Sequence, residues 1–310
     1  MQIDRRTFVA AVGAIGAAAI VRPVARAATA SDPTPLEVAY AGSMTSLVEG
    51  PLKAAALKDL GLDLHGRPQG ASGLAALIAG GSISPDVFIS VTASPIRTTI
   101  AAKKVERAVP IARTRMVIAY TRNGPRGKKF AAIGKRGAEP WYAILSEPGV
   151  RFGRTDPATD PQGRNIVFTM QLAEKFYRRD DLVAKILGPL QNPTQIFAEP
   201  SVEARLQGGT LDAASAYAVQ PGAFGVPYVD LPPEIDLGDE KFAATYATAS
   251  LSLDGKTYRP EPLVYYAATV AGGAHPAEAM KFVAWLAGSS AQALFALAGY
   301  DAPGGSAALS

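Results

Sequence analysis

Apolar and polar positions along residues 31–310 form short strand-like runs that alternate with helical patterns. Residues 36–40 alternate apolar with polar side chains, as a half-buried strand does. Residues 86–91 and 116–120 are nearly continuous apolar runs, which is typical of buried parallel strands. The predicted strands cover residues 36–40, 86–91, 116–120, 150–152, 213–217 and 263–270. This order favours an α/β architecture with largely parallel sheets.

Helical periodicity follows several of these runs. The predicted helices begin near residues 42, 70, 163, 201, 276 and 289. Pro276 has the place of a first-turn proline, and Gly288 is expected to end that helix. We expect surface loops at residues 122–140, which are rich in Gly, Lys and Arg, and at residues 231–260.

The first 30 residues are typical of an export signal. Arg5 and Arg6 precede an apolar stretch at residues 9–21, as in a twin-arginine signal, and small residues near position 30 offer cleavage sites. The alternative is a disordered or amphipathic N-terminus. The leader holds four Arg and one Asp, a net charge of +3. The whole chain carries +4, so residues 31–310 carry a net charge near +1. We therefore expect no nucleic-acid partner.

The chain contains no Cys and only two His residues, His65 and His275. The lack of Cys excludes disulfides, thiolate metal sites, cysteine nucleophiles and a lipid anchor on Cys. The two His residues do not have metal-site spacing, so we expect no zinc site and no cofactor. Together with the leader, this composition predicts a soluble protein in the periplasm of a two-membrane bacterium.

The most informative segment is residues 153–165, where a short strand meets a loop with two Asp-Pro pairs and then a helix start. Free backbone N–H groups and the helix dipole make such a corner an anion-binding site. Similar corners are expected at residues 41–43, 70–73 and 198–202. One such corner is usually an ordinary helix cap. Four together favour a protein that surrounds an oxyanion with neutral hydrogen-bond donors.

Nearly all of residues 31–310 carry a family resemblance, and the Asp-Pro loop is its most specific part. The segments are YAGSM (40–44), GASG (70–73), PDVFIS (85–90), ARTRMVIAYTRN (112–123), WYAILSEPGVRFGRTDPATDPQGRN (141–165), QLAEKFY (171–177), LQGGTLDAASAYAVQ (206–220), LPPEIDLGD (231–239) and AHPAEAMKFVAWLAG (274–288). On these segments the chain resembles the periplasmic molybdate/tungstate-binding proteins of ABC importers.

The resemblance implies the type II periplasmic binding-protein fold, with two α/β lobes and a ligand cleft between them. Residues 31–114 and 259–310 would form lobe 1, and residues 115–258 would form lobe 2, after an export signal at residues 1–30. It also implies a monomer without catalytic activity that delivers molybdate or tungstate to the membrane permease of an ABC transporter.

Carried over by position, the resemblance predicts five ligand-binding residues. Ser43 and Ser72 would donate hydrogen bonds from lobe 1. The backbone near Asp160, the N–H of Val202 and the hydroxyl of Tyr217 would donate from lobe 2. From the residues alone, Tyr217 at the end of a predicted strand is either such a donor or a core tyrosine.

One position departs from the family pattern. In the archaeal tungstate-binding branch, two carboxylates bind the metal of the oxyanion; Asp160 matches the first, but Ala216 stands where the second would be. Asp160 is therefore either a direct metal ligand or a loop residue whose charge pairs with Arg154 or Arg164. Ala216 favours the second interpretation, and the choice between molybdate and tungstate stays open.

Two other functions are alternatives. The first is a binding protein for sulfate, phosphate, ferric ion or a small organic anion. Tyr265 and Tyr266 resemble the tyrosine pairs of ferric-binding proteins, but their place in a late strand favours a structural role. The second is an exported enzyme, against which the lack of Cys and of a G-x-S-x-G motif with a His partner argues.

Overall fold

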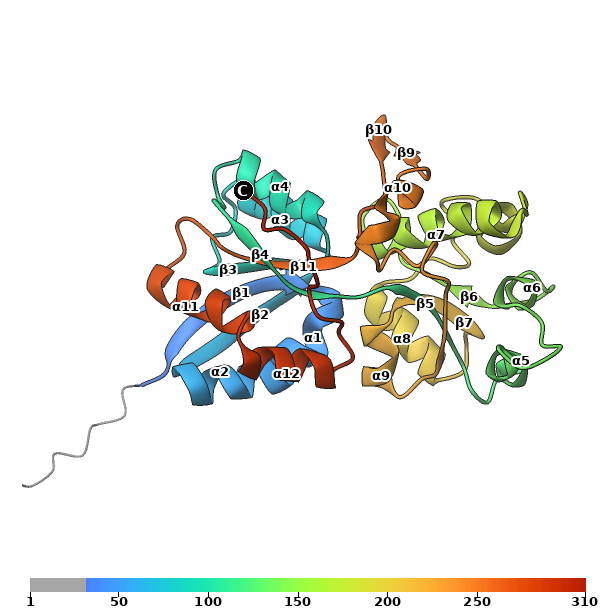
Figure 1. Cartoon of the computed structure of the whole chain (residues 1–310), viewed down its shortest axis with the longest axis horizontal. Coiled ribbons are helices and arrows are strands. Elements are labelled where there is room, and N and C mark those ends of the chain that lie inside the picture. The colour runs from blue at the N-terminus through green and yellow to red at the C-terminus, as the bar shows by residue number, and fades with distance from the viewer. Residues whose placement is uncertain (1–31) are drawn as a thin grey trace, which may run out of the picture. The chain divides into compact units, whose positions relative to one another are not determined.

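The computed structural model describes residues 32–310, so the predicted export signal lies outside the described residues. Residues 33–310 form two mixed sheets, each covered by helices, and a small hairpin (Figure 1). We call the part built on the five-stranded sheet lobe 1 and the part built on the four-stranded sheet lobe 2.

The sheet of lobe 1 has the strand order β2-β1-β3-β11-β4. Its strands are β1 Thr34–Ala41, β2 Leu62–Gln69, β3 Val87–Ser90, β4 Ala108–Arg113 and β11 Val264–Thr269. Strand β1 is parallel to β2 and β3, whereas β11 is antiparallel to β3 and β4. A strand from the C-terminal part of the chain thus completes a sheet that the N-terminal part begins.

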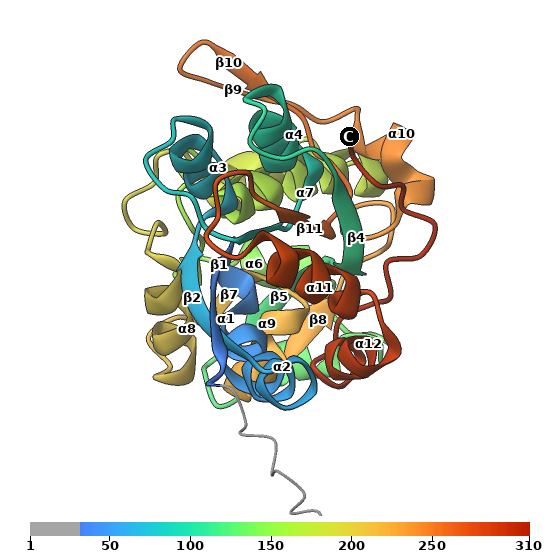
Figure 2. The same cartoon turned by 90° about the vertical axis from the view of Figure 1, so that its left-hand side faces the viewer.

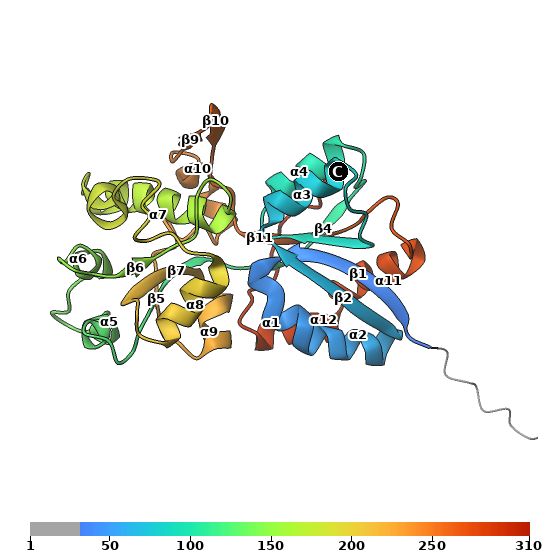
Figure 3. The same cartoon turned by 180° about the vertical axis from the view of Figure 1, so that it is seen from behind.

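The sheet of lobe 2 has the order β6-β7-β5-β8. Its strands are β5 Met116–Tyr120, β6 Phe152–Gly153, β7 Ala213–Tyr217 and β8 Tyr228–Asp230, and the hairpin consists of β9 Leu251–Leu253 and β10 Lys256–Tyr258. Only Thr114 and Arg115 separate β4 from β5, so the chain passes from one sheet to the other there. It returns to the first sheet before β11 (Figure 3).

The prediction of largely parallel sheets is wrong. Among the strand pairings of residues 32–310, five are antiparallel and three are parallel. Strand β11 enters its sheet from lobe 2, and β5 enters its sheet from lobe 1, so both run against their neighbours. Continuous apolar runs predicted burial on both faces correctly, but burial alone does not fix strand direction.

Helices cover both faces of the first sheet, with α3 and α4 on one face and α2, α11 and α12 on the other (Figure 2). The helical segments of lobe 1 are η1 Gly42–Met44, α1 Thr45–Leu47, η2 Val48–Leu52, α2 Lys53–Leu60, α3 Ala71–Ala79, α4 Ala93–Ala101, α11 Pro276–Leu286 and α12 Ser289–Leu297. Within residues 32–310, no single helix combines the length and hydropathy needed to span a membrane, although α11 and α12, bent by 59°, reach them as a pair.

Lobe 2 is built around a long helix, α7 Pro161–Tyr177, which packs on β7 and β5. The other helical segments are α5 Gly127–Ala132, α6 Trp141–Leu145, η3 Val183–Leu187, α8 Glu199–Gln207, α9 Val219–Phe224, η4 Glu240–Phe242 and α10 Ala243–Tyr246. The surface loops predicted at residues 122–140 and 231–260 therefore contain helices, and the second also contains the hairpin. The prediction missed these short elements because their sequences are mostly polar and only a few apolar residues pack on lobe 2.

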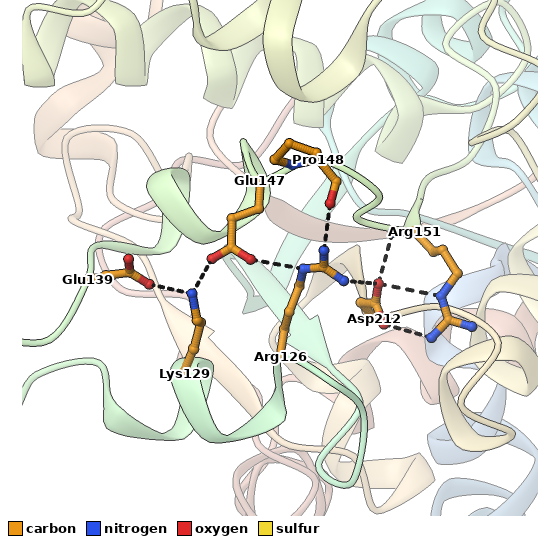
Figure 4. A network of polar contacts seen from close by, with 7 residues as sticks. All are labelled: Arg126, Lys129, Glu139, Glu147, Pro148, Arg151 and Asp212. Atoms are coloured by element: carbon orange, nitrogen blue, oxygen red, sulfur yellow. Dashed lines mark hydrogen bonds and ion pairs between the residues drawn. The ribbon is translucent and has the colours of Figure 1, made fainter.

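A buried ion-pair network fixes the start of β7 in lobe 2 (Figure 4). The side chain of Asp212 accepts hydrogen bonds from Arg126 at 3.1 Å and from Arg151 at 2.6 Å. Lys129 and Arg126 both contact Glu147, which extends the network to the surface. Burial alone would raise the pKa of Asp212, but the bonds and charges of the two Arg residues hold it below its usual range.

Candidate functional site

The corner after β1 places Ser43 in a short helical turn. Strand β1 ends at Ala41, and η1 leads directly into α1, so the helix start predicted here is confirmed. The Ser43 hydroxyl lies 2.9 Å from the hydroxyl of Tyr265 on β11. Tyr265 is fully buried, whereas Ser43 is partly exposed at the boundary between the lobes.

The second corner places Ser72 in the first turn of α3, after the N-cap Gly70. Its hydroxyl oxygen accepts a hydrogen bond of 3.2 Å from Nη2 of Arg164. Arg164 belongs to α7 in lobe 2, so this bond joins the two lobes. The guanidinium also donates to the carbonyl oxygen of Pro157 at 3.0 Å and lies 4.7 Å from the ring centre of Tyr258.

The third corner uses Asp160 as the N-cap of α7. Its Oδ1 accepts a 2.8 Å bond from the backbone N–H of Gln162, and Pro161 occupies the first helical position, where no N–H is needed. A Cβ on Gly163 would lie 2.5 Å from the carbonyl oxygen of Thr155, so the loop closes on the helix only because this residue is glycine. Burial raises the pKa of Asp160, and the bond from Gln162 counteracts part of this rise.

The expected pairing of Asp160 with Arg154 is wrong. Arg154 is fully buried and donates to Gln195 and to the carbonyl oxygen of Leu190. Among residues 32–310, no ion pair joins Asp160 to either Arg154 or Arg164. The charge of Arg164 does act on Asp160 and lowers its pKa.

Tyr217 ends β7 and is 2% exposed. Its hydroxyl oxygen accepts a 3.0 Å bond from Nδ2 of Asn165, which is also buried. Asn165 directly follows Arg164, so two consecutive residues of α7 hold Ser72 and Tyr217. Burial raises the pKa of Tyr217 well above its usual value, and the nearby charge of Asp160 adds to this effect.

The fourth corner presents a carboxyl group. Helix α8 begins at Glu199, with Ala198 as its N-cap. The N–H of Val202 donates to the carbonyl oxygen of Ala198 at 3.1 Å, and the Val202 side chain is buried beside Leu206. Pro200 has no N–H to offer. In this structure the predicted donor at Val202 is thus engaged within its own helix.

Glu199 reaches from lobe 2 towards lobe 1. Its Oε1 accepts a 2.6 Å bond from Nε2 of Gln220. The oxygen of the Gln220 amide accepts from the backbone N–H of Tyr217 and from Gln162, which fixes the amide orientation. A Cβ on Gly42 would lie 2.7 Å from Oε2 of Glu199, so the glycine leaves room for this oxygen where α8 faces α1 (Figure 3).

The pKa of this carboxyl is raised. Burial raises the pKa of Glu199 to about 8, and the charges of Asp160 and Glu203 contribute to the rise. Burial also raises the pKa of Glu203 to about 7. In the neutral acid, a proton on Oε2, the oxygen near Gly42, would leave Oε1 free to accept from Gln220.

A cavity of about 890 Å³ extends from this region between residues of both lobes. Ser43, Gly70, Asp160 and Glu199 line its polar part; Ser72, Val202 and Tyr217 do not line it. Its apolar walls come from Leu47, Pro51, Val219, Phe224 and Leu297. Within residues 32–310, no group of three or more His, Cys, Asp or Glu residues is arranged to hold a metal ion.

Several residues of this region were not found from the sequence. Glu199 had a local signal, because it is an acidic residue in the first turn of a helix, where the helix dipole favours a carboxyl group. Asn165 had none, because its partner Tyr217 lies 52 positions away in the chain. Tyr265 was expected to be a structural tyrosine of a late strand, and its contact with Ser43, 222 positions away, was not predicted. Contacts of that kind follow only from the packing of the sheets.

The match to a family model decides the class of protein. Residues 36–301 match the model of the bacterial extracellular solute-binding proteins. The chain belongs to this family. The family assigned from the resemblance is confirmed, and so is the two-lobed fold.

Two relatives illustrate the range of the family. An uncharacterized solute-binding protein of Petrotoga mobilis is 30% identical over 216 residues, which are 67% of this chain and 65% of the relative, so the chain spans just under two thirds of that protein. The molybdate/tungstate-binding protein WtpA of Thermococcus kodakarensis is 26% identical over 293 residues, which are 86% of this chain and 82% of the relative.

Solved structures share the fold at low sequence identity. The periplasmic molybdate-binding protein of Azotobacter vinelandii superposes with a TM-score of 0.57 at 17% identity, covering 86% of this chain and 98% of that one. The sulfate-binding protein SubI of Mycobacterium tuberculosis superposes with a TM-score of 0.60 at 14% identity, covering 86% of each chain. At such identities the likeness concerns the fold and not the ligand.

Proposed function

We propose that this protein captures a tetrahedral oxyanion, molybdate or tungstate, outside the cytoplasm and delivers it to the permease of an ABC transporter. It acts as a monomer without catalytic activity, and the leader at residues 1–30 exports it to the periplasm by the twin-arginine route. Lobe 1 comprises residues 31–114 and 259–310, and lobe 2 comprises residues 115–258. The binding residues are Ser43, Ser72, Asp160, Val202 and Tyr217.

The observation that carries this proposal is a set of three hydroxyl groups at the boundary of the lobes. Ser43 and Ser72 start helical segments of lobe 1, and Tyr217 ends a strand of lobe 2. Arg164 and Asn165, adjacent in α7, contact Ser72 and Tyr217, which brings these two hydroxyls to one helix end. Donors from two lobes suit an anion that is trapped when the lobes close.

Two features reduce the negative charge that a bound dianion would meet at this site. Arg164 supplies one buried cation, and Glu199 is largely neutral at pH 7 because burial raises its pKa to about 8. A dianion therefore meets a neutral acid at this corner instead of a second full negative charge. The Thermococcus protein, named for binding molybdate and tungstate, and the Azotobacter protein, named for binding molybdate, support the same ligand class.

The size of the cavity favours one second candidate, a small organic anion. About 890 Å³ is within the range of pockets for organic ligands and exceeds the needs of one tetrahedral ion. Leu47, Phe224 and Leu297 would contact the apolar part of such a ligand. Closure of the lobes around a bare oxyanion would instead shrink this space.

A thermal-shift panel on residues 31–310 separates the candidates. Molybdate, tungstate, sulfate, phosphate, ferric ion and a set of small carboxylates are each added to the same protein. Molybdate or tungstate should raise the melting temperature, since a ligand bound only by the folded state stabilises it by about 2.7 kcal/mol at a hundred times Kd. No shift with these two ions and a clear shift with another would reassign the ligand.

A further inference from the structure

Whether a hydroxyl can bind an oxyanion depends on what its own oxygen atom does. A Ser or Tyr hydroxyl has one proton to donate and lone pairs that accept, whereas the oxygens of a tetrahedral oxyanion offer only acceptors. A hydroxyl that gives its proton to the protein has nothing left for the anion. One whose oxygen accepts from the protein keeps its proton available.

Asn165 donates to the Tyr217 oxygen and so leaves the proton of this hydroxyl available. The Nδ2 group lies 3.0 Å from the Tyr217 oxygen and can only donate to it. Among the hydrogen bonds of residues 32–310, the Tyr217 hydroxyl takes part in this one alone, and as the acceptor. With 2% of the residue exposed, a proton without an acceptor here would be costly unless a ligand accepts it.

Arg164 likewise donates to the Ser72 oxygen and leaves the proton of that hydroxyl available. A guanidinium has no acceptor atom, so the Ser72 oxygen must be the acceptor in their 3.2 Å contact. The carbonyl oxygen of Pro157 and the ring of Tyr258 hold the guanidinium from two other directions. Its position is therefore set within lobe 2, and only its Nη2 edge reaches lobe 1.

Tyr265 is placed to donate to the Ser43 oxygen in the same way. Either oxygen of their 2.9 Å contact could donate. If Ser43 gives its proton to an anion, Tyr265 must donate to Ser43, which forms a chain from Tyr265 through Ser43 to the ligand. Successive bonds in such a chain strengthen one another. Tyr265 is fully buried, which favours the protonated, donating form of its hydroxyl.

We propose that Arg164, Asn165 and Tyr265 are positioning residues. Each donates a hydrogen bond to one hydroxyl of the site (Ser72, Tyr217 and Ser43, respectively), which leaves the proton of that hydroxyl free and so favours an acceptor-only ligand. This inference rests on the proposed oxyanion function and names residues beyond it. An acceptor-only ligand is favoured at these three points, because each hydroxyl already accepts a bond from the protein and keeps its proton for the ligand. The three residues come from α7 and β11, outside the helix starts that hold the two Ser residues.

Double-variant cycles with molybdate as the probe test this inference by calorimetry. Tyr265→Phe should weaken binding roughly five- to tenfold, because the Ser43 hydroxyl loses its fixed orientation. In a Ser43→Ala background the same change should have no further effect, since it acts through Ser43. Tyr266→Phe, the adjacent buried tyrosine on β11, is the matched control and should bind like the wild type.

The pair Asn165→Leu and Tyr217→Phe gives a second, independent cycle on lobe 2. This cycle tests the inference if circular dichroism shows that Tyr265→Phe does not fold. Wild-type affinity in a folded Tyr265→Phe or Asn165→Leu variant would overturn the inference, and so would losses that add fully in the double variants. These results leave the proposed function standing. Absence of molybdate and tungstate binding by the wild type would instead refute the proposed function, and this inference with it.

Discussion

Raising the pH from about 7 to about 9 should weaken oxyanion binding, and Glu199 is the reason. Its pKa of about 8 places the change from neutral acid to carboxylate within this interval. Below the pKa, the proton on Oε2 can donate to a ligand oxygen; above it, a negative charge faces the dianion. The sign is therefore fixed: affinity is highest below pH 8 and falls as Glu199 ionises.

The magnitude follows from the fraction of neutral acid. If only the neutral form binds, the apparent Kd doubles at a pH equal to the pKa and rises about tenfold one unit above it, which corresponds to about 1.4 kcal/mol. Asp160 and Glu203 contribute to the raised pKa, and Tyr217 and Tyr265 stay uncharged across the interval because burial raises their pKa values. Molybdate keeps its two charges in this range, so the ligand does not add to the slope.

Calorimetric titration with molybdate at several pH values measures this slope directly. Glu199→Gln keeps a neutral donor at the same place, and its affinity should depend less on pH in this interval than that of the wild type, because only Glu203, whose pKa burial raises to about 7, still ionises there. Glu106→Gln, an exposed site in lobe 1, is the matched control and should retain the wild-type slope. An unchanged slope in Glu199→Gln, or wild-type binding that strengthens with pH, would refute the reasoning.

Two further predictions concern the donors and the ion-pair network. Ser43→Ala and Ser72→Ala should each weaken molybdate binding by about 1.5–3 kcal/mol, as measured by calorimetry, with little change in the melting temperature of the ligand-free protein. Unchanged affinity in both would remove these two Ser residues from the binding site. Asp212→Ala should lower the free energy of unfolding at pH 7 by about 1–3 kcal/mol in denaturant titrations, because it removes the acceptor of the Arg151 backbone N–H, whereas Arg126 keeps Glu147 and the Arg151 side chain is partly exposed to water. A loss below about 1 kcal/mol would contradict the role given to this network.

The helix starts around the site could be predicted because their signals are local. Gly42, Gly70 and the Asp-Pro loop each mark a place where a strand ends and a helix begins, and η1, α3 and α7 start there. Small residues and N-cap side chains determine such corners within a few positions of the chain. The element types and the approximate places of the donors therefore follow from the sequence.

Strand direction and charge pairing could not be predicted in this way. The antiparallel entry of β11 depends on where the chain returns to lobe 1, about 150 residues after it left. Sequence proximity suggested Arg154 as the partner of Asp160, but the chain directs Arg154 to the carbonyl oxygen of Leu190 instead. A buried Arg needs several acceptors, and only the packed loop shows where they are.

The remaining question is the role of Asp160, for which the cap geometry favours one answer. Its Oδ1 accepts the N–H of Gln162, and an amide oxygen can accept the same bond, so Asp160→Asn should keep α7 folded. Removal of the charge should then leave molybdate affinity equal or higher, because a negative group next to the dianion is lost. If Asp160 instead ligates the metal of the oxyanion, the same variant binds more weakly, and X-ray absorption of the wild-type complex finds more than four oxygen atoms around the metal. A marked loss of affinity in Asp160→Asn, with circular dichroism unchanged, would decide for direct ligation, and Glu199, whose pKa the charge of Asp160 raises, would then be a candidate for the second carboxyl.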